Sequence, residues 1–191
     1  MNLGYFSYPM PANEPVLNYA PGSNERAQLK KVLSELKNKE TDVPMYIGSE
    51  EVRTEKKVAL HPPHEIAHTL GYYYAGNEEH VKQAIDAAMN AREAWANMPW
   101  EERAHIFLKA ADLMAGKYRY HMNGTTMLGQ SKNPFQAEID SACELIDFLR
   151  FNVHFLSEIY KTQPNNALGM HNRLEFRPLE GFVLAITPFN F

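Results

Sequence analysis

Cysteine is almost absent from the 191-residue sequence, in which Cys143 is the single thiol. One thiol cannot form a disulfide within the chain, so a secreted scaffold held together by disulfides is excluded. Long apolar runs are absent as well, because none approaches the roughly 20 residues that a membrane-spanning helix needs. We therefore expect neither a disulfide framework nor a membrane segment.

An excess of basic residues is also missing. The net charge is −4, with acidic and basic side chains mixed along the chain, which argues against a nucleic-acid partner. The first sixteen residues contain no Lys or Arg, so they match neither a secretory signal nor an Arg-rich mitochondrial presequence. Either the protein is cytosolic, or a targeting segment is absent from this form of the chain.

Two kinds of ligand site lack a sequence signature. The chain contains neither the G-x-G-x-x-G nor the G-x-x-x-x-G-K-[ST] pattern of phosphate-binding loops. His61, His64 and His68 are close enough in sequence to suggest a metal site, but Pro62 and Pro63 prevent a regular helix across them and no cysteine joins the group. We expect these histidines to lie in a loop, and we expect no metal.

The residues that are present indicate a globular chain that is largely helical. Its hydrophobic fraction of 45% and charged fraction of 22% are typical of folded domains. Residues 1–22 contain several prolines and no hydrophobic period, so we predict an extended arm there. A helix then begins near Ser23 or Asn24, either of which can cap it. Its apolar stripe consists of Leu29, Val32, Leu33 and Leu36.

Helical periodicity is strongest over residues 77–161. Asn77 is a suitable N-cap for the first helix of this region, a second helix follows Pro99, and a third is predicted over residues 118–130. The clearest helix extends from Asn133 to residue 161.

The start of this last helix carries its own signals. Asn133 can cap it, Pro134 fits the first helical position, and Gln136 stands where a capping box requires Glu or Gln. Because its apolar residues cover two sides, we predict that the helix is buried against several neighbours.

Strands are predicted in two parts of the chain. Short strands are expected at Met45–Ile47 and Lys57–Leu60, within loops. After Pro164, Arg173–Arg177 alternates in polarity and predicts a half-exposed strand, whereas Phe182–Ile186 is a continuous apolar run, typical of a strand covered on both faces of a parallel sheet. A parallel strand needs partners that come later in the chain, so we expect this sequence to be a fragment of a larger α/β protein.

Residues 179–191 (LEGFVLAITPFNF) resemble the aldehyde dehydrogenase superfamily, whose members carry a Gly-led apolar strand followed by Pro, an aromatic residue and Asn. Earlier segments resemble the pyrroline-5-carboxylate dehydrogenases within this superfamily. These segments are residues 13–16 (NEPV), 103–112 (RAHIFLKAAD), 136–140 (QAEID) and 144–152 (ELIDFLRFN). The resemblance covers the chain from about Asn13 to its end.

The resemblance implies an α/β, aldehyde dehydrogenase-like fold. It is represented here by the N-terminal helical segment and the first strands of the oligomerisation and Rossmann-like domains. Residues 23–191 would form this N-terminal part, helical over 77–161 and with strands over 173–187, truncated before the catalytic domain.

The implied reaction is the oxidation of L-glutamate γ-semialdehyde to L-glutamate in proline catabolism, with NAD as cofactor. A small aldehyde is the substrate, the full-length protein is a homo-oligomer, and the compartment is the mitochondrial matrix. In the family the nucleophilic Cys, the general-base Glu and the phosphate-binding loop lie beyond this sequence, so we expect the chain alone to be inactive.

Two alternatives stay open. The chain could be a non-catalytic short form that associates with full-length subunits through Arg173–Arg177, or the parent could be a dehydrogenase of another aldehyde.

The resemblance also assigns site residues. Asn190 is the expected catalytic residue, because a side-chain amide at the carboxyl end of a parallel strand can donate to the oxyanion that forms on an attacked carbonyl. The alternative is a turn Asn after Pro188. Phe191 is expected in the aromatic wall around the substrate, with an ordinary core Phe as the alternative.

Glu144 matches a family Glu that reaches the substrate tunnel, and its alternative is a solvated or Arg-paired side chain. Thr187, Pro188 and Phe189 are expected to line the NAD cleft, mainly through their backbone. Cys143 lies in mid-helix with no helix N-terminus to lower its pKa, so we interpret it as a packing residue rather than a nucleophile.

Overall fold

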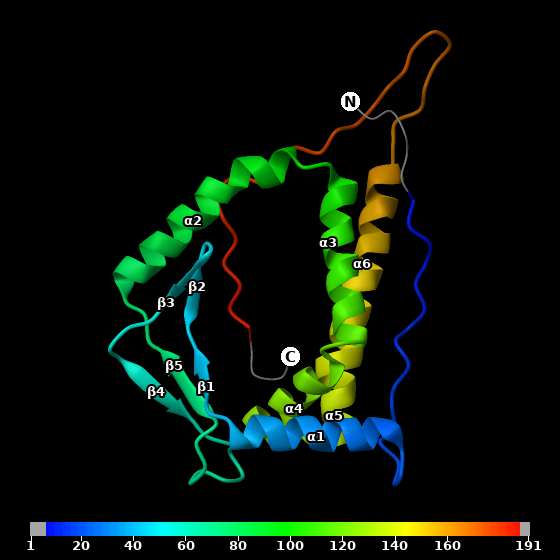
Figure 1. The fold of residues 1–191 in the computed structure, drawn as a ribbon. Helices are drawn as coiled ribbons and strands as arrows, with labels where there is room; N and C mark the ends of the chain where they lie inside the picture. Colours follow the sequence, from blue (N-terminus) through cyan, green and yellow to red (C-terminus); the bar gives the residue numbers. More distant parts are fainter. Residues whose placement is uncertain (1–6, 188–191) are drawn as a thin grey trace.

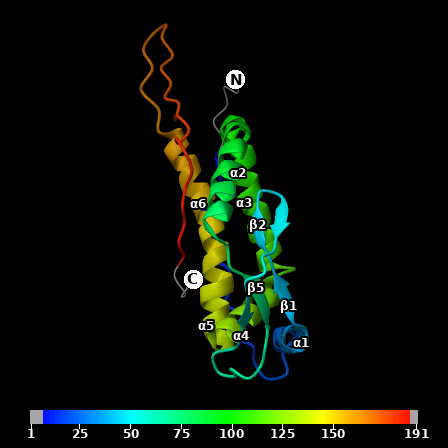
Figure 2. The same cartoon turned by 90° about the vertical axis from the view of Figure 1, so that its left-hand side faces the viewer.

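Helices dominate the computed structural model, which describes residues 7–187 (Figure 1). The helices are α1 (Asn24–Asn38), α2 (Glu78–Asn97), α3 (Trp100–Ala115), α4 (Arg119–Gln130), α5 (Pro134–Ala137) and α6 (Glu144–Lys161), with a π-helical segment η1 (Glu138–Cys143) joining α5 to α6. Helices α3 and α6 lie side by side, and α1 packs across α4 at one end of this pair. Seen edge-on, the helices and strands form a thin layer with the C-terminal segment on one side (Figure 2).

The predicted helix starts are confirmed by their caps. The Ser23 hydroxyl accepts a hydrogen bond from Arg26 N–H at the start of α1, and the Asn77 side chain accepts from His80 N–H at the start of α2. Asn133 and Gln136 form the predicted reciprocal capping box, at 2.9 and 3.0 Å. These short-range patterns are legible in the sequence because cap and helix are close along the chain.

The long helix predicted from Asn133 differs from a single α-helix. Its six-residue segment η1 has π geometry, and Glu144 N–H donates to Ile139 O five residues earlier. The prediction that this helix is buried against several neighbours is wrong for the described residues. Ile146 and Val153 are buried, but Phe148 remains 60% exposed and Phe155 48% exposed, because α3 covers only one side of α6.

Within residues 7–187, five short strands form two small sheets. β1 (Thr41–Val43) is parallel to β5 (Gly71–Tyr74), which pairs antiparallel with β4 (Lys57–Leu60), and β2 (Met45–Ile47) pairs antiparallel with β3 (Glu50–Val52). Strands β2 and β4 match the prediction, whereas β1, β3 and β5 were not predicted. Gly71 allows β5 to approach β1, since a Cβ there would lie 2.0 Å from Thr41 O.

The two C-terminal strand predictions are corrected by the structure. Arg173–Arg177 forms no strand. Instead, Leu174 N–H donates to Gln163 Oε1 at 2.8 Å, and Gln163 Nε2 donates to Leu174 O at 3.3 Å. Phe182–Ile186 also forms no strand, and Val183, Leu184 and Ile186 are 79%, 74% and 83% exposed. A strand requires a paired neighbour, and no described strand lies beside either segment.

The core is small and lies where α3 and α6 meet. Ala111, Ala142 and Ile146 are fully buried there, with Leu149 packed against them. Within residues 7–187, no helix combines the length and apolarity that a bilayer crossing requires.

Candidate functional site

A buried polar cluster joins the N-terminal arm to the helices. Glu138 and Asn123 are completely buried and Arg119 is 5% exposed. Arg119 forms ion pairs with Glu138 and with Glu14. The cluster brings together the arm, the first residue of α4 and the first residue of η1.

The Glu138 carboxylate is surrounded by donors. One oxygen, Oε1, accepts from Leu17 N–H at 2.8 Å and from Nε and Nη2 of Arg119. The other, Oε2, accepts from the Tyr19 hydroxyl at 2.6 Å and from Asn123 Nδ2 at 2.7 Å. A buried carboxylate is tolerated only with such compensation, and removing one partner of a buried ion pair typically costs about 3–5 kcal/mol.

The same cluster fixes the arm on α6. Besides Arg119 Nη1, Glu14 accepts from Arg150 Nη1 at 2.5 Å, and Arg119 Nη2 donates to Pro15 O at 2.7 Å. Asp147 accepts from Asn13 Nδ2 and from Glu14 N–H, both at 2.7 Å. Residues 7–22 of the arm form no helix or strand, so these contacts supply the partners that secondary structure would otherwise supply.

The cluster also shifts the pKa values of its members. Burial alone would raise the pKa of Glu138, but the hydrogen bonds from Arg119, Tyr19 and Leu17 N–H lower it below its ordinary value. The pKa of Tyr19 is raised by burial and then by its hydrogen bond to Glu138. At neutral pH, Glu138 is therefore a carboxylate and Tyr19 a phenol.

Sequence reasoning missed this cluster as a unit, although a signal was present. Residues 13–16 and 136–140 are two of the segments that carry the family resemblance, and Glu14 and Glu138 within them both pair with Arg119. Arg119 is the single Lys or Arg in α4, and this was the second signal in the sequence. The spacing of residues in the sequence does not connect Glu14, Arg119 and Glu138, because these positions are far apart in the chain.

Cys143 lies at the edge of the cluster and is buried. Its sulfur is 3.5 Å from Arg119 Nη2 and 3.8 Å from Pro15 O. Burial first, and then the negative charge of Glu138, raise the pKa of this thiol to about 11. Because the thiolate is the nucleophilic form, these surroundings support the interpretation of Cys143 as a packing residue.

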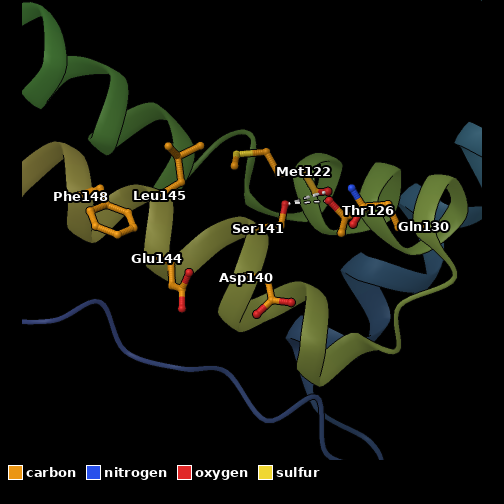
Figure 3. Close-up of a pocket in the computed structure, with 8 residues that line it drawn as sticks. All are labelled: Met122, Thr126, Gln130, Asp140, Ser141, Glu144, Leu145 and Phe148. Carbon is orange, nitrogen blue, oxygen red and sulfur yellow. Dashed lines mark hydrogen bonds between the residues drawn. The ribbon is translucent and has the colours of Figure 1, made fainter. Parts of the chain in front are cut away.

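Glu144 lies directly after the π segment and lines two cavities. The first, of about 160 Å³, is also lined by Met122, Thr126, Ser141 and Phe148 (Figure 3). The Thr126 and Ser141 hydroxyls are hydrogen-bonded there at 2.8 Å.

The second cavity, of about 350 Å³, has Asn13, Glu144, Asp147, Phe148, Phe151, Asn152 and Phe155 in its wall. The Glu144 side chain forms no hydrogen bond or ion pair with another residue in the range 7–187. The Arg-paired alternative for Glu144 is therefore not what the structure shows: Arg150 pairs with Glu14 and Asp112 instead.

The other predicted site residues are not brought to these cavities. Thr187 is exposed at the end of the unpaired C-terminal segment. Pro188, Phe189, Asn190 and Phe191 lie outside the described residues. The described residues also contain neither of the two Gly-rich patterns of phosphate-binding loops.

The ring nitrogens of two of the three loop histidines contact oxygen atoms rather than another imidazole ring. Nδ1 of His61 lies 2.8 Å from His68 O, and Nδ1 of His64 lies 2.7 Å from the Ser131 hydroxyl. Among residues 7–187, no group of three or more His, Cys, Asp or Glu side chains is placed to hold a metal ion.

Comparison with known proteins identifies the class. The model of the aldehyde dehydrogenase family matches residues 50–191, so the chain belongs to this family.

Individual relatives show which members of the family this chain resembles. The delta-1-pyrroline-5-carboxylate dehydrogenase of Agaricus bisporus is 51% identical over 191 residues, which cover 99% of this chain and 35% of the relative. The mitochondrial enzyme of that name from Dictyostelium discoideum is 44% identical, over 96% of this chain and 33% of the relative. The chain thus spans about a third of the length of the curated relatives it matches.

Solved structures show a similarity to the same group of enzymes. The crystal structure of the Mycobacterium tuberculosis delta-pyrroline-5-carboxylate dehydrogenase bound with NAD superposes with a TM-score of 0.95 and 46% identity, covering 100% of this chain and 36% of that one. A Thermus thermophilus 1-pyrroline-5-carboxylate dehydrogenase mutant superposes over 82% of this chain with a TM-score of 0.70 and 25% identity. The aldehyde dehydrogenase-like fold expected from the sequence is confirmed.

Proposed function

We propose that this chain is the N-terminal part of an NAD-dependent dehydrogenase that oxidises L-glutamate γ-semialdehyde, the open form of pyrroline-5-carboxylate, to L-glutamate. The observation that carries the proposal is the fold match, at a TM-score of 0.95 over the whole chain, to a delta-pyrroline-5-carboxylate dehydrogenase bound with NAD. Its relatives of the same name, at 51% and 44% identity, support it further.

Activity can be tested in a hybrid protein. The matched segment of the Agaricus bisporus relative is replaced by this chain, and NADH absorbance is followed with pyrroline-5-carboxylate and, separately, with an aliphatic aldehyde that has no amino or carboxyl group. We expect turnover with pyrroline-5-carboxylate and little with the plain aldehyde. The purified 191-residue chain alone should show no turnover above blank. A folded hybrid that prefers the plain aldehyde would refute the proposed substrate.

Asn190 is our proposed oxyanion donor. It follows an apolar run at the position where open α/β sheets place ligand groups. Replacing one oxyanion-hole donor typically lowers kcat about 10²–10³-fold, so the hybrid with Asn190→Ala should lose that much. The matched control is Asn97→Ala, which removes an exposed amide at the end of α2 and should leave kcat unchanged. Equal kcat values in the two variants would remove Asn190 from the mechanism.

Glu144 is our proposed substrate-binding residue, with Phe191 in the aromatic wall and residues 187–189 beside NAD. The Glu144 carboxylate lines both cavities and has no partner among the described residues. An amino-acid aldehyde carries an ammonium group that such a carboxylate can bind through a charge-assisted hydrogen bond. Glu144→Gln in the hybrid should therefore raise KM more than it lowers kcat, while Glu158→Gln, an exposed change on the same helix, should change neither.

Subunit association is the second candidate function, as a short form that binds longer subunits. The exposed segment 173–187 favours it, because an apolar run without a paired neighbour is suited to strand addition. Co-purification of the tagged chain with the Agaricus bisporus enzyme tests it, with a chain ending at residue 172 as control. Homo-oligomerisation of the whole protein is proposed on the same ground.

The mitochondrial matrix is the proposed compartment. Relatives from Dictyostelium discoideum, Emericella nidulans and Danio rerio carry the word mitochondrial in their names. Imaging the complete coding sequence fused to a fluorescent protein tests this, and a cytosolic signal would contradict it.

A further inference from the structure

One cavity beside α6 has walls from two distant parts of the chain. Asn13 of the arm and Glu144 of α6 line the same space of about 350 Å³, together with Asp147 and the aromatic side chains of Phe148 and Phe151. The wall that Asn13 provides exists only while the arm lies against α6. The groups that hold the arm therefore determine the shape of this cavity.

Polar contacts hold the arm on either side of Asn13. Met10 and Val16, which flank this part of the arm, are 61% and 51% exposed, so they bury little apolar surface. Glu14, in contrast, bridges Arg119 and Arg150, and its own N–H donates to Asp147. Removing the Glu14 charge should loosen this part of the arm, because hydrogen bonds to charged groups are the stronger ones.

The π segment leads into the opposite wall. Glu138, its first residue, is fully buried and binds Arg119. Glu144, which directly follows the last residue of η1, lines the cavity. The position of Glu138 is therefore connected to that of Glu144 through six residues of helical backbone.

We propose that Glu14, Arg119 and Glu138 are positioning residues for the cavity that contains Glu144. The Arg119 guanidinium contacts Glu14 and Pro15 O on the arm and Glu138 at the start of η1. One side chain thus fixes both walls of the cavity. The consequence for substrate binding rests on the proposed function, whereas the dependence of the arm on Glu14 does not.

Hydrogen–deuterium exchange on the 191-residue chain tests the structural part. Glu14→Gln removes the charge but leaves the Arg119–Glu138 pair intact, so the fold should persist. We expect peptides covering residues 13–17 to exchange about tenfold faster, with α3 and the buried face of α6 unchanged. The matched control is Glu158→Gln, which removes an exposed carboxylate paired with Lys161 and should leave both regions unchanged. Unchanged exchange over residues 13–17 in Glu14→Gln would overturn the proposal.

The hybrid enzyme tests the functional part. Glu14→Gln should raise KM for pyrroline-5-carboxylate about threefold or more with kcat within about twofold, since it disturbs a wall and no reacting group. Glu14→Asp, which keeps the charge, should recover part of that change.

The outcomes separate the two proposals. Faster exchange with an unchanged KM would overturn the positioning role. An unsubstituted hybrid that is inactive would instead count against the proposed function, and the exchange result would still decide whether Glu14 holds the arm.

Discussion

Two regions of this molecule reverse the usual distribution of polar and apolar side chains. Around Arg119, charged groups are buried, with Glu138 completely inaccessible to solvent. Along residues 182–186 the reverse holds, because an apolar run is 50–83% exposed at the four positions Phe182, Val183, Leu184 and Ile186. Burial is thus decided by the partners a segment meets more than by its own polarity.

The difference lies in where those partners come from. The Glu138 carboxylate finds its partners within the described residues, since the arm and α4 each supply a donor to both of its oxygens. The C-terminal segment makes a few isolated contacts, such as that of Arg92 in α2, whose Nε donates to Leu179 O at 3.3 Å. A polar group can be satisfied by a few well-placed atoms, whereas an apolar run needs a whole surface to cover it.

The largest effect is expected where a buried charge loses its partner. Arg119→Met leaves Glu138 unpaired and should lower the free energy of unfolding by about 3–5 kcal/mol, measured by urea denaturation with far-UV circular dichroism. The double change Arg119→Met with Glu138→Met should recover most of this loss, because it removes both charges.

The control for that experiment is Lys31→Met. Lys31 forms an exposed pair with Glu35 at 4.0 Å, and its loss should cost no more than about 0.5 kcal/mol. If Arg119→Met were as mild as this control, the buried cluster would not be what holds the arm and helices together.

A matched valine pair compares the two regions directly. Val153 on α6 is 3% exposed and Val183 in the C-terminal segment is 79% exposed. Val153→Ala should cost about 1–3 kcal/mol in the same denaturation assay, because it empties a packed position. Val183→Ala should stay within about 0.5 kcal/mol. Equal losses would mean that the C-terminal segment is packed in solution.

Lowering the pH should reduce the stability of the folded chain gradually, through the charged cluster, and by less than the destabilising substitutions above. The pKa of Glu138 is lower in the folded chain than its ordinary value near about 4.3 in the unfolded chain. The stabilisation it provides is therefore complete above that ordinary value and is lost as the pH falls through the folded-state pKa, at about 1.4 kcal/mol for each unit of separation.

Urea midpoints measured from neutral pH down to about pH 3 check this, with the range chosen around the ordinary Glu pKa. Glu138→Gln should show a flatter dependence than the unchanged chain, and exposed carboxylates common to both cancel in the comparison. Parallel curves for the two proteins would mean that Glu138 contributes nothing to acid sensitivity.

The sequence predicted the elements that depend on neighbours along the chain. Caps at Ser23, Asn77 and Asn133 were correct because a cap and its acceptor or donor are three residues apart. The site was predicted less completely. Glu144 was expected near substrate, but its aromatic cavity and the wall contributed by Asn13 depend on chain segments that periodicity does not connect.

The sequence by itself determined where the helices of this protein begin, that Cys143 is a poor nucleophile, and that the chain resembles aldehyde dehydrogenases. Only the tertiary structure decided that Arg119 joins Glu14 to Glu138, that six residues before α6 adopt π geometry, and that residues 173–187 form no strand. The physical reason is the distance along the chain over which each interaction acts. Caps and helical periods act over a few residues, whereas a buried ion pair or a sheet depends on groups brought together from distant parts of the chain.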